Sequence, residues 1–173
     1  MKISLKTDKE TLLKLLKDSD FNKKLKVLGK LHELSESDQI KILLKILEDS
    51  SWYMREQATK ELAQFGSKIV PRLKKLCSKG FWYTRAAACR TLSEICELDA
   101  TETILKLLLT DDNPTVLKEA KTAIKKLAEK NGENFLLHIK QLKIEQKLGE
   151  PECSILIECL PEQQTKLKEI FQE

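Results

Sequence analysis

Few side chains in this 173-residue chain have the types and spacing that catalysis needs. The two histidines, His32 and His138, are far apart in the sequence. The five cysteines form no Cys-x-x-Cys pair, and the sequence has no Gly-x-Ser-x-Gly motif, no His-Glu-x-x-His motif and no glycine-rich phosphate-binding segment. We therefore expect no catalytic residue, no metal site and no cofactor.

A second group of residues has the chemistry of binding. The segment Trp52-Tyr53-Met54-Arg55 returns 30 residues later as Trp82-Tyr83-Thr84-Arg85. Helical geometry places the two tyrosines of this repeat on one face with several lysines and an arginine, and aromatic anchors beside cations suit an acidic or extended peptide partner. Duplication of a structural unit would produce the same repetition, and the elements that carry these residues must therefore be identified first.

The duplicated segment is part of a longer repeat. A second apolar pattern with i, i+3, i+4 spacing precedes each copy, and this spacing marks one face of an α-helix. Joints rich in Asp, Ser and Asn separate the two patterns, and these residue types cap helix N-termini. The unit is a helical hairpin, and such hairpins must stack because one alone cannot cover its apolar faces. The recurring second-helix positions, at offsets of 31, 30 and 32 residues, are Val27, Leu31 and Leu34; Ala58, Leu62 and Phe65; Ala88, Leu92 and Ile95; and Ala120, Ile124 and Leu127.

The expected architecture is all-α, with hairpins at about 8–34, 38–66, 67–96 and 99–130. Residues 1–130 thus form the repeat region, and residues 131–173 depart from the pattern. In this last segment we expect a helix at about 133–148, a break at Gly149-Glu150-Pro151 and a final helix that ends near Phe171. The end of a stack needs a cover, so we interpret the segment as a C-terminal helical cap; an independent docking peptide is the alternative.

The second copy of the repeat resembles the second-helix pattern of the HEAT-repeat family. Its residues, in the family's order, are Met54-Arg55-x-x-Ala58-x-x-x-Leu62-x-x-Phe65-Gly66. The resemblance covers about residues 8–130 and implies a right-handed α-α superhelix, or solenoid. It also implies a ladder between neighbouring repeats, made by a turn aspartate and a second-helix arginine. Asp49 with Arg55 fits this ladder, whereas Lys79 stands at the aspartate position of the third repeat, so Arg85 must find another partner.

One stripe of the second helices is the expected binding surface. With Ala58 facing the core, helical geometry places the stripe on the opposite, usually concave side of the stack. A solvated helix face with incidental tyrosines is the alternative interpretation. Trp52 and Trp82, in the first turns, are expected to cover the end of the hairpin core. The expected partner-binding residues are Tyr53, Lys60, Tyr83, Arg90, Lys118 and Lys125.

Two other classes of function are alternatives to a protein-binding adaptor. The lysines of 118–130 could contact nucleic-acid phosphates without reading sequence, but interspersed glutamates and only four arginines count against this. HEAT-like DNA glycosylases and bilin lyases share the expected architecture, yet no aspartate lies on the inner stripe of repeats two to four. His32-Glu33 resembles one His-Glu pair of the HEAT-like di-iron deoxyhypusine hydroxylases, whose metal site needs several pairs. We therefore expect a non-enzymatic scaffold for a peptide or protein partner.

Composition sets the remaining expectations. The first ten residues contain no apolar segment and no run approaches about 18 apolar residues, so we expect no signal peptide and no membrane contact. An odd number of cysteines, most of them in apolar helical patterns, indicates reduced thiols and a cytoplasmic protein. The net charge is +4, and residues 150–173 carry six glutamates and two lysines.

Overall fold

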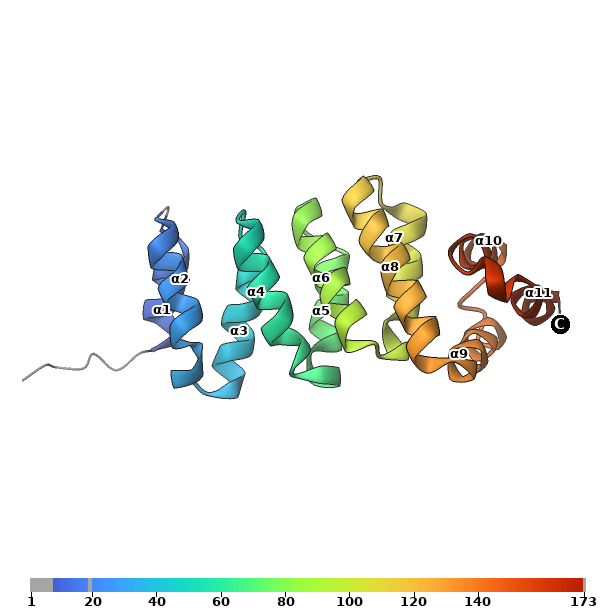
Figure 1. Ribbon diagram of the computed structural model, residues 1–173, viewed down its shortest axis with the longest axis horizontal. Helices are drawn as coiled ribbons and strands as arrows, with labels where there is room; N and C mark the ends of the chain where they lie inside the picture. The colour runs from blue at the N-terminus through green and yellow to red at the C-terminus, as the bar shows by residue number, and fades with distance from the viewer. Residues whose placement is uncertain (1–7, 19, 173) are drawn as a thin grey trace, which may run out of the picture.

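The structure, a computed structural model, describes residues 8–18 and 20–172. These residues form eleven α-helices and four short 3-10 segments, and no strand occurs within these ranges. Four helical hairpins stand side by side in one row, and three further helices lie at the C-terminal end of that row (Figure 1). The all-α stack that the hydrophobic periodicity predicts is thus confirmed.

Each hairpin consists of a first and a second helix. The four hairpins are α1 (Lys9–Leu16) with α2 (Phe21–Lys30), α3 (Glu36–Ile46) with α4 (Trp52–Ala63), α5 (Val70–Cys77) with α6 (Trp82–Ile95), and α7 (Thr101–Thr110) with α8 (Pro114–Asn131). The C-terminal helices are α9 (Glu133–Ile144), α10 (Glu150–Cys159) and α11 (Gln164–Gln172).

Three of the four second helices begin at a polar N-cap residue. Asp20, Ser51 and Asn113 each accept a hydrogen bond from a backbone N–H in the first turn of their helix. This bond satisfies one of the N–H groups that lack an intrahelical partner. Helix α6 is the exception, because Phe81 occupies its N-cap position and offers no side-chain acceptor.

Small buried residues allow the second helices to approach one another. Ala58, Ala88 and Ala120 have no exposed surface, and α6 packs against both α4 and α8. In α6 the four consecutive residues 86–89 are all buried, because neighbouring helices surround this helix on most sides. Larger side chains at these positions would force the helices apart.

One hydrophobic core runs through the whole stack. It begins with Leu12 in α1, passes between the first and second helices of every hairpin, and reaches Leu167 in α11. Each hairpin is therefore stabilised by its neighbours, as expected for a repeat protein.

The C-terminal helices pack against the last hairpin and against one another. Helix α10 contacts α7 and α8, and α11 contacts α9 and α10. Phe135, Leu156 and Leu167 of these helices are fully buried. The apolar end of the fourth hairpin is covered in this way.

The boundaries in this segment differ from the expected ones. Helix α9 ends at Ile144, earlier than expected, and Gln146 then adopts a left-handed backbone with φ of 58°. The expected break at 149–151 is instead the start of α10. Gly149 N–H donates to Glu152 Oε2 at 2.8 Å, and Pro151 lies in the first turn, where a missing N–H costs no hydrogen bond.

Candidate functional site

Exposed aromatic side chains gather at the N-terminal ends of three consecutive second helices, α2, α4 and α6. All of them are between 43% and 68% exposed. Contiguous apolar patches on a protein surface commonly mark interaction sites. We call this set the aromatic surface; it consists of Phe21, Trp52, Tyr53, Phe81 and Trp82.

Ring contacts join some members of the aromatic surface to one another or to Tyr83. Phe21 and Tyr53 meet edge to face with ring centroids 6.0 Å apart. The half-buried Tyr83 stacks on Phe81 at 5.2 Å and meets Trp82 edge to face at 5.6 Å. Tyr83 therefore packs against the exposed rings of Phe81 and Trp82, while Tyr53 is itself part of the aromatic surface.

A small cavity lies between α4 and α6, with Trp52 and Trp82 in its lining. Its volume is about 150 Å³, and Arg55, Tyr83 and Ala87 also line it. Pockets for small molecules are usually about 300–1,000 Å³. The cavity therefore suits one inserted side chain of a partner better than a whole small-molecule ligand.

The exposure of the two tryptophans corrects the expectation that they cover the end of the hairpin core. Trp52 is 62% exposed and Trp82 is 43% exposed. Met54 and Thr84, two residues further along, take the core-facing positions and are buried. Two residues correspond to roughly 200° around a helix, so each tryptophan must point away from the core.

The lysines of the expected stripe are exposed. Lys60 lies 3.4 Å from Glu56 Oε1, one turn earlier on α4. Lys118 and Lys125 lie on the surface of α8, and neither forms an ion pair with another residue of the described ranges. Neither of them lines the cavity beside the tryptophans. The structure therefore does not bring the stripe lysines and the aromatic surface into direct contact.

Arg90, the sixth residue of the expected stripe, is bound within the protein. Its Nη1 donates to Glu56 Oε2 at 2.8 Å, and its Nε donates to Glu119 Oε2 at 3.1 Å. A further short contact joins Nη2 to Glu119 Oε1. The Glu119 carboxylate, and after it Glu56, raise the pKa of Arg90. Arg90 thus cross-links α4, α6 and α8, and its charge is balanced.

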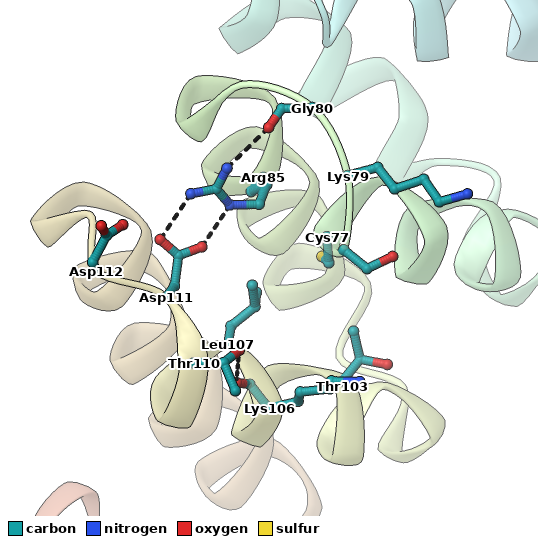
Figure 2. A pocket seen from close by; sticks show the side chains of 11 residues that line it. Cys77, Lys79, Gly80, Arg85, Thr103, Lys106, Leu107, Thr110, Asp111 and Asp112 are labelled. Carbon is teal, nitrogen blue, oxygen red and sulfur yellow. Dashed lines mark hydrogen bonds and ion pairs between the residues drawn. The ribbon is translucent and has the colours of Figure 1, made fainter.

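A ladder of charge pairs connects neighbouring repeats on the turn side. Lys24 Nζ lies 2.7 Å from Asp49 Oδ2 in the turn of the following repeat. Arg85 donates from Nε and Nη2 to Asp111 of the following turn at 2.5 and 2.9 Å, and from Nη1 to the Gly80 carbonyl at 2.9 Å (Figure 2). Each rung joins a second-helix cation to the turn aspartate of the next repeat.

These pairs join two successive repeats, whereas the expected pair of Asp49 with Arg55 lies inside one repeat. Arg55 Nη1 donates to the main-chain carbonyls of Asp49 and Ser50 at 2.7 and 2.8 Å. The Asp49 carboxylate accepts instead from Lys24 and from the Ser51 backbone N–H. The Asp49 carboxylate pairs with Lys24 and not with Arg55 because it faces the preceding repeat.

Arg55 itself meets an aromatic ring and no carboxylate of the described residues. Its Cζ lies 4.8 Å from the centroid of the Tyr83 ring. The next turn carries Lys79 where the other turns carry aspartate. Burial lowers the pKa of Arg55, whereas the hydrogen bond that Arg85 donates to Asp111 raises the pKa of Arg85.

Other candidate chemistry finds little support in the geometry. Of the lysines of 118–130, Lys121 lies 2.5 Å from Glu158 and Lys126 lies 2.7 Å from Glu94. Burial raises the pKa of the Cys77 thiol to about 12, which disfavours a nucleophilic thiolate. Within residues 8–18 and 20–172, no group of three or more potential metal ligands occurs. No helix in the same ranges has both the length and the apolar character to cross a membrane.

The stacked hairpins define an α-solenoid, and the sequence comparison identifies its family. A family model of HEAT repeats matches residues 9–78 and again residues 69–139. The chain belongs to the HEAT-repeat family, because these matches cover more than half of it. HEAT repeats are typically protein-interaction scaffolds and are generally not enzymes. No curated protein matches the chain.

Four members of the aromatic surface were not among the expected partner-binding residues: Phe21, Trp52, Phe81 and Trp82. Of these, Phe21 and Phe81 had no expected role at all. Phe21 occupies the position of Trp52 in the first repeat. Phe81 stands where the other repeats place a capping residue. An exposed aromatic residue at a position that normally takes Asp, Ser or Asn is a signal that the sequence already contains.

Proposed function

We propose that this chain is a protein-interaction adaptor that binds a peptide or protein segment on its aromatic surface. The observation that carries the proposal is the exposure of Trp52 and Trp82 beside one cavity. Tryptophan and tyrosine dominate the binding energy of protein interfaces when they anchor in pockets. An inserted side chain of the partner would bury both indole rings.

The stack supports such binding because it fixes the anchors in place. The helices that carry the aromatic surface are held by the continuous core and by Arg90. A preordered surface loses little conformational entropy when a partner binds. We assign Arg90 and Tyr83 to the support of the surface, and Tyr53 to the contact with the partner.

The exposed lysines extend the proposed surface along the second-helix side. Lys60, Lys118 and Lys125 attract an acidic partner over a longer range than the rings do. They act mainly on the rate of association, and this rate should fall as salt is added.

Binding of peptides to the full chain tests the proposal. A display library of 12-residue random peptides is selected on the immobilised protein, and the affinity of the best peptides is measured by fluorescence polarisation. We expect the double variant Trp52→Ala/Trp82→Ala to bind them about tenfold or more weakly. Urea unfolding of the same variant verifies that it is folded.

A matched control removes exposed apolar side chains elsewhere. Leu137 and Ile144 on α9 are 65% and 63% exposed. The variant Leu137→Ala/Ile144→Ala should bind the peptides with unchanged affinity. Equal affinity of both double variants would contradict the assigned surface. Salt-sensitive binding to duplex DNA, with no peptide selected, would favour the nucleic-acid alternative.

We also infer a cytoplasmic location from the thiols. All five cysteines are free, and four of them are buried. Unpaired cysteines are typical of compartments that keep thiols reduced.

A further inference from the structure

The inter-repeat ladder has two filled rungs with the same kinds of partner. In each, a second-helix cation holds the carboxylate of the turn aspartate that follows: Lys24 holds Asp49, and Arg85 holds Asp111. Both aspartates also accept a hydrogen bond from the backbone N–H two residues later. The carboxylate is therefore a regular part of this position in the repeat.

The rung between them lacks its carboxylate. Arg55 occupies the cation position, but the facing turn offers Lys79 and Gly80. Arg85 Nη1 donates to the carbonyl of Gly80 in its own turn, and Arg85 Nε and Nη2 donate to Asp111. Arg55 likewise uses Nη1 for the carbonyls of its own turn. Its Nε and Nη2 donate to no other described residue, so the edge that holds the aspartate in the next rung is free.

The surroundings of this edge favour an anion. The exposed Lys79 stands at the turn, and the first turn of α6 contains no acidic residue and no side-chain cap. The carboxylates closest in sequence are engaged: Asp49 pairs with Lys24, and Glu56 pairs with Arg90 and Lys60. Burial lowers the pKa of the Arg55 guanidinium, and its electrostatic interactions with Tyr83 and Asp49 offset this effect only in part.

We propose that the free edge of Arg55 binds a carboxylate of the partner, which takes the position of the missing turn aspartate. Arg55 lines the same cavity as Trp52 and Trp82. The partner is then a peptide with an Asp or Glu next to an apolar residue, whose side chain enters between the two tryptophans. This inference rests on the proposed function and names the class of partner for that surface.

A carboxylate is the expected group because both filled rungs contain one. The planar guanidinium presents two parallel N–H donors that match a carboxylate, as Arg85 does with Asp111 (Figure 2). An aspartate or glutamate side chain reaches this edge from an extended peptide, and the Trp52–Trp82 cavity accepts its apolar neighbour.

Two matched peptide libraries test this assignment on the full chain. In one library every peptide has a central Glu, and in the other the same position is Gln. Binding of individual peptides is followed by tryptophan fluorescence, since Trp52 and Trp82 are the two tryptophans of the chain. The variants are Arg55→Gln and Arg55→Lys, and the control is Arg72→Gln, which removes an exposed charge from α5.

We expect the wild type to prefer Glu peptides by about tenfold, the range expected when a charge-assisted hydrogen bond is lost. Arg55→Gln should bind Glu and Gln peptides equally, Arg55→Lys should keep part of the preference, and Arg72→Gln should keep all of it. Urea unfolding verifies that each variant is folded.

The contradicting results separate this inference from the proposed function. Equal binding of both libraries by the wild type would overturn the carboxylate assignment and leave the aromatic surface as a binding site. Binding of neither library would refute the proposed function itself. Clearly tighter binding of phosphoserine peptides than of Glu peptides would overturn the carboxylate in favour of a phosphate group.

Discussion

The Arg85 guanidinium meets the Asp111 carboxylate through two nitrogens, with Nε 2.5 Å from Oδ2 and Nη2 2.9 Å from Oδ1. The Asp111 side chain is only 4% exposed, whereas that of Arg85 is 21% exposed. Removing one partner of such a pair leaves the other poorly solvated. This contact therefore couples the third and fourth repeats more strongly than a surface ion pair would.

Asp111→Asn should lower the free energy of unfolding by about 1–3 kcal/mol, because a charge-assisted bidentate hydrogen bond is lost. The measurement is urea unfolding followed by circular dichroism. Glu158→Gln, which removes the exposed partner of Lys121, is the control and should cost less than about 1 kcal/mol. An equal loss of unfolding free energy in both variants would show that the Arg85–Asp111 pair stabilises the protein no more than a surface ion pair does.

The same pair predicts a pH dependence. The hydrogen bonds from Arg85 hold the pKa of Asp111 below its ordinary value of 3.8 in the folded state. Its contribution to stability is thus complete above the unfolded-state pKa and is lost as the pH falls through the folded-state pKa. The stability difference between wild type and Asp111→Asn should be constant from about pH 5 to 7 and shrink below about pH 4. A difference that grows on acidification would contradict this.

Phe81→Ser should be more stable than Phe81→Ala, and both variants should bind the peptides more weakly than the wild type does. Phe81 already has an extended backbone with φ of −67° and ψ of 155°, so a serine there can cap α6 as Ser51 caps α4. The expected gain over Phe81→Ala is about 1 kcal/mol in urea unfolding. Phe81→Ala also removes the ring but supplies no cap, which separates the two effects. If the serine and alanine variants are equally stable, the N-cap of α6 has no energetic role.

Arg90→Gln should reduce stability more than it reduces peptide affinity. Its loss leaves Glu119, with a side chain 13% exposed, without its partner. We expect a cost of about 1–3 kcal/mol in urea unfolding, together with a smaller loss of peptide affinity than Trp52→Ala produces. The opposite order of effects would assign Arg90 to the partner contact and not to the support of the surface.

The repeats could be predicted from the sequence because periodic apolar residues determine them locally. Ala58, Ala88 and Ala120 lie in the core as their spacing requires. The ladder partners could not be predicted in the same way, since they depend on how adjacent repeats are offset in space. Asp49 was therefore assigned to Arg55, whereas its carboxylate meets Lys24.

The expected binding stripe was only partly informative for a similar reason. Helical angles place Arg90 on the face of α6 that points away from the core, but they do not show that Glu56 and Glu119 of two neighbouring helices enclose it. The exposure of Trp52 follows from its angle to Met54, once Met54 is known to face the core. The boundary of α10 was missed because Pro151 was interpreted as a helix breaker and not as a first-turn residue.

In the proposed complex, the partner binds over the cavity between α4 and α6. The chain has two tryptophans, and both line this cavity, so the two indole N–H signals in a ¹H–¹⁵N correlation spectrum report on it directly. Titration with a selected Glu-containing peptide should shift both indole signals in proportion to binding, and the matched Gln peptide should shift them only at clearly higher concentration. Saturable peptide binding that leaves both indole signals unmoved would contradict the account.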